Sequence, residues 1–297
     1  MSARSRPVDP SLEPEVTAFF DAETNSVSYV VKDPNSRSCA VIDPVMDFDY
    51  AAGRIGHASA SKIIAFIEQR GLALEWLIET HVHADHLSDA PYIQTRLGGK
   101  IGIGENVVLV QENFGRVFNE GPEFKRDGSQ FDHLFRAGEV YKIGGMSARA
   151  LHTPGHTPAC MTHVVGDAAF IGDTLFMPDG GTARADFPGG DARALYRSIR
   201  SILALPVETR LFVCHDYAPN DREIHWESSV AEERANNIHV RDGITEDQFV
   251  AMREARDKTL GMPKLIIPSV QVNMRAGRLP LPGADGRRFL KVPIDGF

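Results

Sequence analysis

The sequence predicts an α+β fold, a layered αββα sandwich in which two β-rich halves pack together and carry helices on their outer faces. Short apolar runs typical of strands occur in both halves of the chain, and amphipathic runs typical of helices lie between some of them. Their order is not the strict alternation of strand and helix that a parallel βα fold requires. In addition, histidine and aspartate residues directly follow several of the strand-like runs.

The first half of the chain contains predicted strands at 16–21, 27–31, 39–43 and 74–79, bounded in part by the turn-forming stretches ETN and DPNSRS. A helix is expected over 61–71, because Ile63, Phe66 and Ile67 share one face and Gly71 can end the helix. A second helix is expected over 90–99, where two glycines end it.

The second half repeats this arrangement, with predicted strands at 147–151, 168–172 and 209–213. Between the last two, a helix is expected over 191–205 with Asp191 as its N-cap. Its apolar face is formed by Leu195, Ile199, Ile202 and Leu203.

The pattern changes after residue 220, where a charged helix is expected over 245–260 and an extended tail rich in proline, glycine and arginine over 262–283. We therefore expect an N-terminal extension at 1–13, a catalytic domain at 14–225, and a C-terminal helix and tail at 226–297 packed on the same domain.

The composition, with 42% hydrophobic and 24% charged residues, is that of an ordinary globular protein. No apolar run approaches the roughly 20 residues that span a membrane, and the stretch MSARSRPVDPSLEPEV lacks the apolar core of a signal peptide. A net charge of −8 disfavours a nucleic-acid surface. Cys39, Cys160 and Cys214 are odd in number and widely spaced, which favours small buried residues in a reducing, cytoplasmic compartment over a disulfide framework.

The stretch THVHADH, residues 80–86, follows a predicted strand and contains His81, His83, Asp85 and His86. Packing four bulky polar groups against the end of a strand is unfavourable unless a cation compensates them. The cluster therefore predicts a metal site.

Three further residues follow strand-like runs in the same way, namely His156 in TPGHT, Asp173 in GDT and His215 in CHDY. Each has an ordinary structural interpretation when taken alone, such as a turn or capping residue for Asp173. If the strands belong to one sandwich, however, their C-terminal ends bring all three residues to the edge where the histidine cluster lies.

Histidine and carboxylate ligands without thiolate suit zinc, iron or manganese. The residues leave two chemistries open. One is a two-metal hydrolase, in which ions roughly 3.5–4 Å apart hold a hydroxide. The other is a mononuclear iron site, in which two histidines and one carboxylate leave positions open for the substrate and O₂.

The motifs THVHADH, TPGHT, GDTLF and CHDY, in this order and spacing, resemble the metallo-β-lactamase superfamily over residues 14–220. Within it, the chain is most similar to the persulfide dioxygenases (sulfur dioxygenases), particularly their bacterial β-lactamase-like hydrolase branch. The stretches ARADFPGG and PSVQVNMRAGRLP carry this more specific similarity. The resemblance implies the αββα sandwich of that superfamily, extended by a C-terminal helix and tail.

The resemblance also implies a single Fe(II) held by His81, His156 and Asp173, which would be the metal-binding and catalytic residues. The residues that would surround and orient these ligands, or hold a second ion, are His83, Asp85, His86 and His215. The expected substrate-binding residues are Arg184, Asp186, Tyr217 and Arg275.

The implied activity is the oxidation of glutathione persulfide by O₂ to sulfite and glutathione in the cytoplasm. The expected partners are a separate rhodanese-type sulfurtransferase and a second copy of the chain in a homodimer. Binding to nucleic acid or to a membrane is not expected. The alternative is a glyoxalase II-like hydroxyacylglutathione hydrolase with zinc or a mixed dinuclear centre. The complete ligand set disfavours a metal- or sulfide-binding sensor. The lack of a predicted signal peptide disfavours a secreted β-lactamase, and the acidic net charge disfavours a nuclease.

Overall fold

The computed structural model describes residues 12–296, which form two six-stranded sheets and a smaller three-stranded sheet. In spatial order, the first sheet contains β1 (Glu15–Asp21), β2 (Ser26–Lys32), β3 (Ser38–Ile42), β6 (Ala73–Ile78), β8 (Lys100–Gly104) and β9 (His133–Phe135). The second contains β10 (Val140–Ile143), β11 (Met146–His152), β12 (Met161–Val165), β13 (Ala168–Phe170), β14 (Arg210–Phe212) and β15 (Glu227–Ser229). The small sheet consists of β5 (Arg54–Gly56), β4 (Val45–Asp49) and β7 (Leu87–Ser88).

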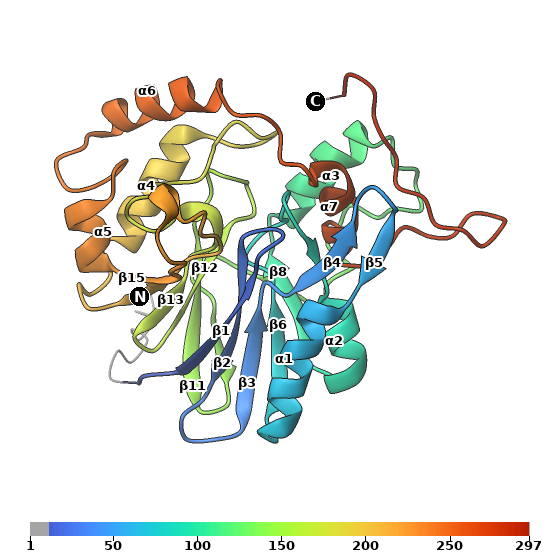
Figure 1. Ribbon diagram of the computed structural model, residues 1–297, viewed down its shortest axis with the longest axis horizontal. Coiled ribbons are helices and arrows are strands. Elements are labelled where there is room, and N and C mark those ends of the chain that lie inside the picture. Colours follow the sequence, from blue (N-terminus) through green and yellow to red (C-terminus); the bar gives the residue numbers. More distant parts are fainter. Residues whose placement is uncertain (1–11, 297) are drawn as a thin grey trace, which may run out of the picture.

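The two large sheets pack face to face, and helices cover their outer faces, so the predicted αββα sandwich is confirmed (Figure 1). Beside the first sheet lie α1 (Ala58–Gln69), α2 (Ala90–Leu97), α3 (Val107–Val117) and α7 (Ile266–Asn273). Beside the second lie α4 (Ala192–Ile202), α5 (Val230–Asn236) and α6 (Glu246–Asp257). Between the sheets, buried aromatic side chains such as Tyr29, Phe170 and Phe212 contact one another. Their burial removes large apolar areas from water and stabilises the sandwich.

The predicted strands and helices of the sequence agree with these elements within a few residues, as α4 illustrates. The side chain of Asp191 caps this helix by accepting a hydrogen bond of 2.7 Å from the backbone N–H of Ala194. The predicted apolar face is buried against the second sheet. Gly71, just beyond α1, has a φ of +60°, the left-handed conformation expected of a residue that ends a helix.

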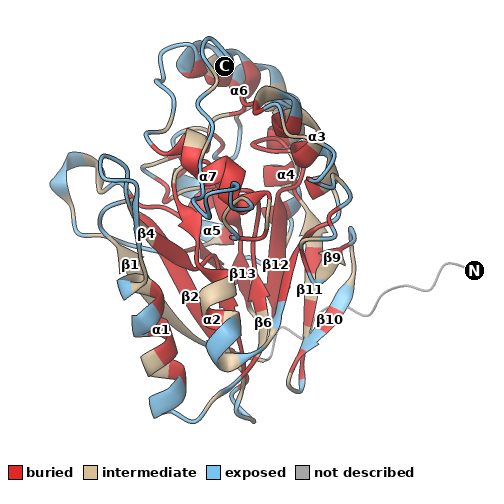
Figure 2. Ribbon diagram, turned by 90° about the vertical axis from the view of Figure 1, so that its right-hand side faces the viewer, coloured by how far each residue is buried: buried red, intermediate tan, exposed pale blue. Residues whose placement is uncertain are grey.

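The prediction of an extended tail over 262–283 is wrong for its first half, because α7 forms there. Nearly every residue of α7 is buried, including the polar residues Ser269, Gln271 and Asn273, so the helix shows no division into an apolar face and a solvent-exposed polar face (Figure 2). Pro268 lies in the first turn, where its missing N–H breaks no helical hydrogen bond. The sequence also did not predict α3.

The C-terminal part of the chain contributes directly to both layers. β15 pairs with β14 in antiparallel orientation, and the side chain of Asn273 at the end of α7 binds the loop that precedes β7. Residues 226–296 therefore pack on the sandwich, and the boundary between residues 225 and 226 remains a prediction. The expected N-terminal extension, residues 1–13, lies outside the described residues except for its last two. No helix within residues 12–296 combines the length and the apolar character needed to cross a membrane.

Candidate metal centre

The predicted ligand residues come together at one edge of the sandwich, where loops follow β6, β11, β13 and β14. The two sheets are joined at this edge by a bridge between Ser26 and His215 and by a hydrogen bond of 2.8 Å from Val27 N–H to the Cys214 carbonyl. Gly172 lets the loop after β13 approach the histidine cluster closely. Its φ is +50°, and a Cβ atom here would lie 2.7 Å from Thr80 Oγ1.

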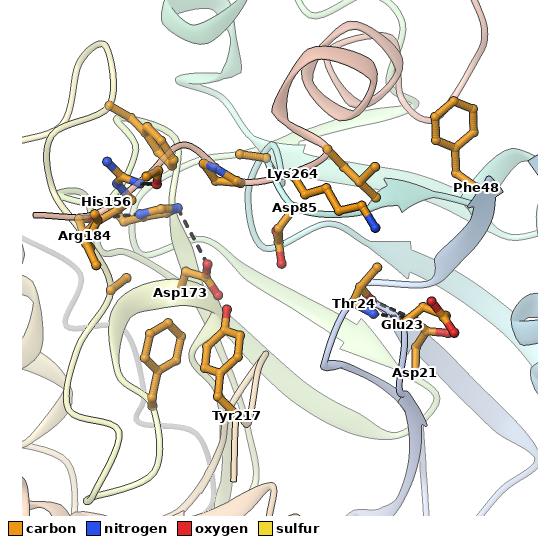
Figure 3. A pocket seen from close by; sticks show the side chains of 18 of the residues that line it. Asp21, Glu23, Thr24, Phe48, Asp85, His156, Asp173, Arg184, Tyr217 and Lys264 are labelled. Atoms are coloured by element: carbon orange, nitrogen blue, oxygen red, sulfur yellow. Dashed lines mark hydrogen bonds and ion pairs between the residues drawn. The ribbon is translucent and has the colours of Figure 1, made fainter. Parts of the chain in front are cut away.

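Three groups point their metal-binding atoms toward one another, namely His81, His156 and Asp173. Asp173 Oδ2 lies 3.8 Å from His81 Nε2 and 3.7 Å from His156 Nε2, beyond hydrogen-bond length (Figure 3 draws the contact with His156). Ligands about 2.1 Å from a shared ion lie about 3.0–3.4 Å from each other, so a small inward shift of these side chains lets all three bind one ion. His81 Nε2 is buried and has no hydrogen-bond partner among the described residues, so the donor set fits a bound cation.

The opposite ring nitrogens of both histidines are fixed by hydrogen bonds. His156 Nδ1–H donates to the carbonyl of Arg184 over 2.8 Å. Thr80 Oγ1 donates to Asp43 Oδ2 over 2.8 Å and can therefore accept from His81 Nδ1–H at 3.1 Å. Both contacts place the lone pair of each imidazole on Nε2, the atom that faces Asp173.

A second group of potential donors lies beside the first and consists of His83, His86, Cys214 and His215. His215 Nε2 lies 3.0 Å from Asp85 Oδ2 and 3.3 Å from Asp173 Oδ1, which connects the two groups. His83 Nε2 lies 2.9 Å from Asp43 Oδ1. The predicted residues thus all belong to one continuous, largely buried cluster.

Burial dominates the electrostatics of this cluster. It lowers the pKa of His81, His83 and His86, and the neighbouring histidines lower the pKa of His81 further. Burial also raises the pKa of Asp173 to about 8, although the adjacent His156 opposes the shift. Neutral imidazoles are the form that binds metals, and a cation would compensate the buried carboxylate.

A cavity of about 830 Å³ opens above this cluster (Figure 3). Asp85, His156 and Asp173 line it, as do the predicted substrate-binding residues Arg184 and Tyr217. Its walls include apolar side chains, among them Phe176 and Phe187. Such a mixed cavity with a few convergent polar groups is typical of a small-molecule site.

The other two predicted substrate-binding residues, Asp186 and Arg275, both form ion pairs with other residues of the protein. Asp186 receives two hydrogen bonds from Arg184, of 2.6 and 2.8 Å. Arg275 is not among the residues that line the cavity. Its guanidinium lies over the ring of Phe124, binds the carbonyl of Gln271 and pairs with Glu120 at 2.9 Å. These contacts hold the Arg275 guanidinium away from the cavity.

Sequence reasoning missed Asp43, Glu79 and Asn273. Asp43 and Glu79 lie behind His83 and are buried with it. Asn273 donates to the backbone carbonyls of His83 and His86 over 2.9 and 2.7 Å, which fixes the loop that carries them. Asp43 could have been found, because it follows an apolar strand just as the predicted ligands do; Asn273 had no such signal.

Comparisons with known proteins agree with this architecture. The sequence profile of the Metallo-beta-lactamase superfamily matches residues 22–215. The chain is 58% identical to a "Probable metallo-hydrolase" of Burkholderia pseudomallei over 95% of this chain and 99% of that protein. It is 42% identical to "Glyoxylase B2" of Dictyostelium discoideum over 95% of this chain and 97% of that protein.

More distant similarity extends to persulfide dioxygenases. "Persulfide dioxygenase ETHE1, mitochondrial" of Mus musculus is 28% identical over 87% of each protein. The crystal structure of ETHE1 from Myxococcus xanthus has a TM-score of 0.71 and 27% identity, covering 89% of this chain and 100% of that one. Beta-lactamase hydrolase-like proteins of Xylella fastidiosa and Agrobacterium fabrum, at 51% and 53% identity, are longer, and this chain spans 65% of their length.

Proposed function

The chain belongs to the metallo-beta-lactamase superfamily, and on this premise we propose that it is a mononuclear Fe(II) persulfide dioxygenase. Its substrate would be glutathione persulfide, and the outer sulfur would be oxidised. In balanced form, GSSH, O₂ and H₂O give GSH and sulfurous acid, which ionises to sulfite. Four electrons pass from sulfur to O₂.

The observation that supports this proposal most strongly is the convergence of His81, His156 and Asp173. Two histidines and one carboxylate on one face of an ion are the ligand set of non-haem iron oxygenases. His83 is not part of this group; its Nε2 atom lies 2.9 Å from Asp43 Oδ1, and it belongs to neighbouring groups of donors. The similarity to the persulfide dioxygenases of Mus musculus and Myxococcus xanthus supports the same activity.

In this proposal, His81, His156 and Asp173 hold the iron. Bound Fe(II) supplies open coordination positions and electrons for chemistry with O₂. Thr80 and the Arg184 carbonyl keep the two imidazoles in the tautomer that presents Nε2. The side chains of the three ligands are buried, and the low dielectric around them strengthens the electrostatic interactions between them and a bound cation.

Residues on the cavity wall would orient the thiol substrate. The Tyr217 hydroxyl points toward Asp173 and is a suitable hydrogen-bond donor to an anionic persulfide (Figure 3). Arg184 and Asp186 would shape the wall as a pair, since the contacts between them occupy much of the guanidinium. The sulfite and glutathione produced would leave through the same opening, and a separate rhodanese-type sulfurtransferase would use the sulfite with further persulfide.

A glyoxalase II-like thioester hydrolase is the alternative, and a specific observation favours it. Asp85, Asp173 and His215 offer ligand atoms within 4.8 Å of one another, beside the first group. With His86, they would hold a second ion, zinc or a mixed pair, and two bound ions would supply an activated water for thioester hydrolysis. The 42% identity to "Glyoxylase B2" supports this alternative.

The two functions are separated by activity and by metal content. Protein purified without oxygen should consume O₂ and form sulfite when glutathione persulfide is added. Hydrolysis of S-lactoylglutathione at ordinary enzymatic rates, without sulfite formation from persulfide, would establish the hydrolase instead. A homodimer, expected from the sequence, is tested separately by light scattering.

A further inference from the structure

The cavity above the candidate metal centre has walls of opposite charge. One wall consists of the turn between β1 and β2 together with β4, and it contributes the carboxylates Asp21, Glu23, Asp47 and Asp49. The other is built from the loop after β13, from α6 and from the segment between α6 and α7, and it contributes the cations Arg184, Arg253, Arg256 and Lys264. An anionic ligand must therefore be attracted by the second wall.

Two of these cations are already neutralised by partners. Arg184 binds Asp186 through two hydrogen bonds and donates a third, of 2.7 Å, to the carbonyl of Gly261. Arg253 is 1% exposed and pairs with Asp257 at 2.6 Å. These two guanidinium groups fix the wall and retain little attraction for a ligand.

The remaining two cations, Arg256 and Lys264, differ from both, because neither forms a side-chain hydrogen bond or ion pair with any residue from 12 to 296. Of the two, Lys264 is carried by the segment that Arg184 holds through Gly261. Its side chain extends into the cavity between Asp85 and Thr24 (Figure 3). The backbone around it is nonetheless held, since Leu265 is buried and Gly261 accepts the hydrogen bond from Arg184. An anchored backbone with an unpaired cation is suited to binding a ligand carboxylate.

The charge of the whole protein makes such a group necessary. With a net charge of −8 and four carboxylates on the facing wall, the long-range field repels an anionic thiol. Attraction must then come from an unpaired cation inside the cavity. Met46, Phe48 and Leu265 lie on the walls nearby and would cover the apolar parts of the ligand.

We propose that Lys264 binds a carboxylate of the thiol substrate and so selects peptide thiols over small uncharged ones. This inference rests on the proposed function, in that the ligand is a thiol of the glutathione type. Lys264 would be a specificity-determining residue supplied by the link between α6 and α7, far in sequence from the metal ligands.

The test measures binding of reduced glutathione to the iron-loaded protein by anaerobic calorimetry, and so needs no turnover. Lys264→Gln should weaken binding about tenfold, the usual cost of losing a hydrogen bond between charged groups. Lys258→Gln is the matched control. Lys258 is exposed and does not line the cavity, and Lys258→Gln removes the same charge. The affinity of this variant protein for glutathione should therefore change less than twofold.

Two further ligands identify the carboxylate. Glutathione monoethyl ester has a blocked glycine carboxylate, and cysteinylglycine lacks the carboxylate of the γ-glutamyl unit. If Lys264 binds one of these groups, the effect of Lys264→Gln disappears with the ligand that lacks it.

The proposal is overturned by an equal loss with all three ligands, by an equal loss in Lys258→Gln, or by the absence of glutathione binding. If Lys264-dependent binding is found but no sulfite is formed from persulfide, the dioxygenase function fails while the inference about Lys264 stands.

Discussion

The Nε2 atom of His83 lies 2.9 Å from Oδ1 of Asp43, and both side chains are buried. The same carboxylate accepts hydrogen bonds from the backbone N–H and the hydroxyl of Thr80, both of 2.8 Å. Thr80 in turn contacts Nδ1 of His81. A single side chain at the end of β3 thus contacts His83 directly and reaches His81 through Thr80.

Asp43→Asn should therefore weaken iron binding without unfolding the protein. The amide keeps the volume of the carboxylate, but one of its two terminal groups can no longer accept the Thr80 hydroxyl hydrogen bond. Loss of such an orienting contact reduces metal affinity about 10–100-fold. Chelator competition measures this affinity, and near-UV circular dichroism checks the fold. Unchanged iron affinity would exclude an orienting role for Asp43.

This relationship could not be predicted from the sequence, whereas the ligand cluster could. His81, His83, Asp85 and His86 are contiguous and follow an apolar strand, so the motif is visible in a short window. Asp43 meets His83 only because β3 and β6 are parallel neighbours, and that pairing depends on the order of strands in the sheet.

The same distinction holds for the rest of the fold. α4 was predictable because its apolar residues recur with helical spacing, and Asp191 caps it. α7 was not, because it is buried on nearly all sides, and its polar residues are buried together with the apolar ones instead of marking an exposed face. The contacts of Arg275 could not be predicted for a related reason, since its partner Glu120 lies in the loop after α3 and no local pattern reveals that pairing.

Metal content should distinguish a one-ion centre from a two-ion centre. We expect about one iron and little zinc per chain in anaerobically purified protein, because two histidines and one carboxylate converge in one group of donors. Elemental analysis measures this ratio. Removing the iron with a chelator should lower the unfolding temperature, since the ion binds the native state alone. Two firmly bound ions per chain would favour the hydrolase.

Alanine variants should divide the cluster into ligands and orienting residues. Replacing His81, His156 or Asp173 should remove the iron outright. Replacing Asp85 or His215 should leave iron bound and lower its affinity or the activity about 10–100-fold. Iron per chain and sulfite formation are measured for each variant. Equal loss of iron from all five would contradict this division of roles.

Arg184→Lys should reduce kcat/KM to a similar extent for glutathione persulfide and for a small persulfide without the glycine carboxylate. The guanidinium binds Asp186 and Gly261, and a lysine cannot reproduce this forked geometry. The altered loop would also shift the Arg184 carbonyl that fixes His156. A loss confined to glutathione persulfide, with iron content unchanged, would show instead that Arg184 binds the glycine carboxylate directly.

Glu233 in α5 should make the protein less stable as the pH rises. Its side chain is fully buried, one carboxylate oxygen accepts a hydrogen bond of 2.7 Å from Asn237, and the other has no partner among the described residues. Burial raises the pKa of Glu233 from 4.5 to about 7, and the nearby carboxylates Glu232 and Asp179 add to the shift. The folded state consequently holds this proton more tightly than the unfolded state.

The sign of the pH dependence follows from this difference. Between about pH 4.5 and 7 the unfolded state has released the proton while the folded state retains it, so the free energy of unfolding falls as the pH rises. Glu233→Gln removes this pH dependence. The free energy of unfolding of the variant, relative to that of the parent, should therefore rise by roughly 3 kcal/mol from pH 4.5 to 8. Urea unfolding at several pH values measures it. Glu254→Gln, an exposed change of the same charge on α6, should show no such trend; a pH-independent difference for Glu233→Gln would contradict the assignment.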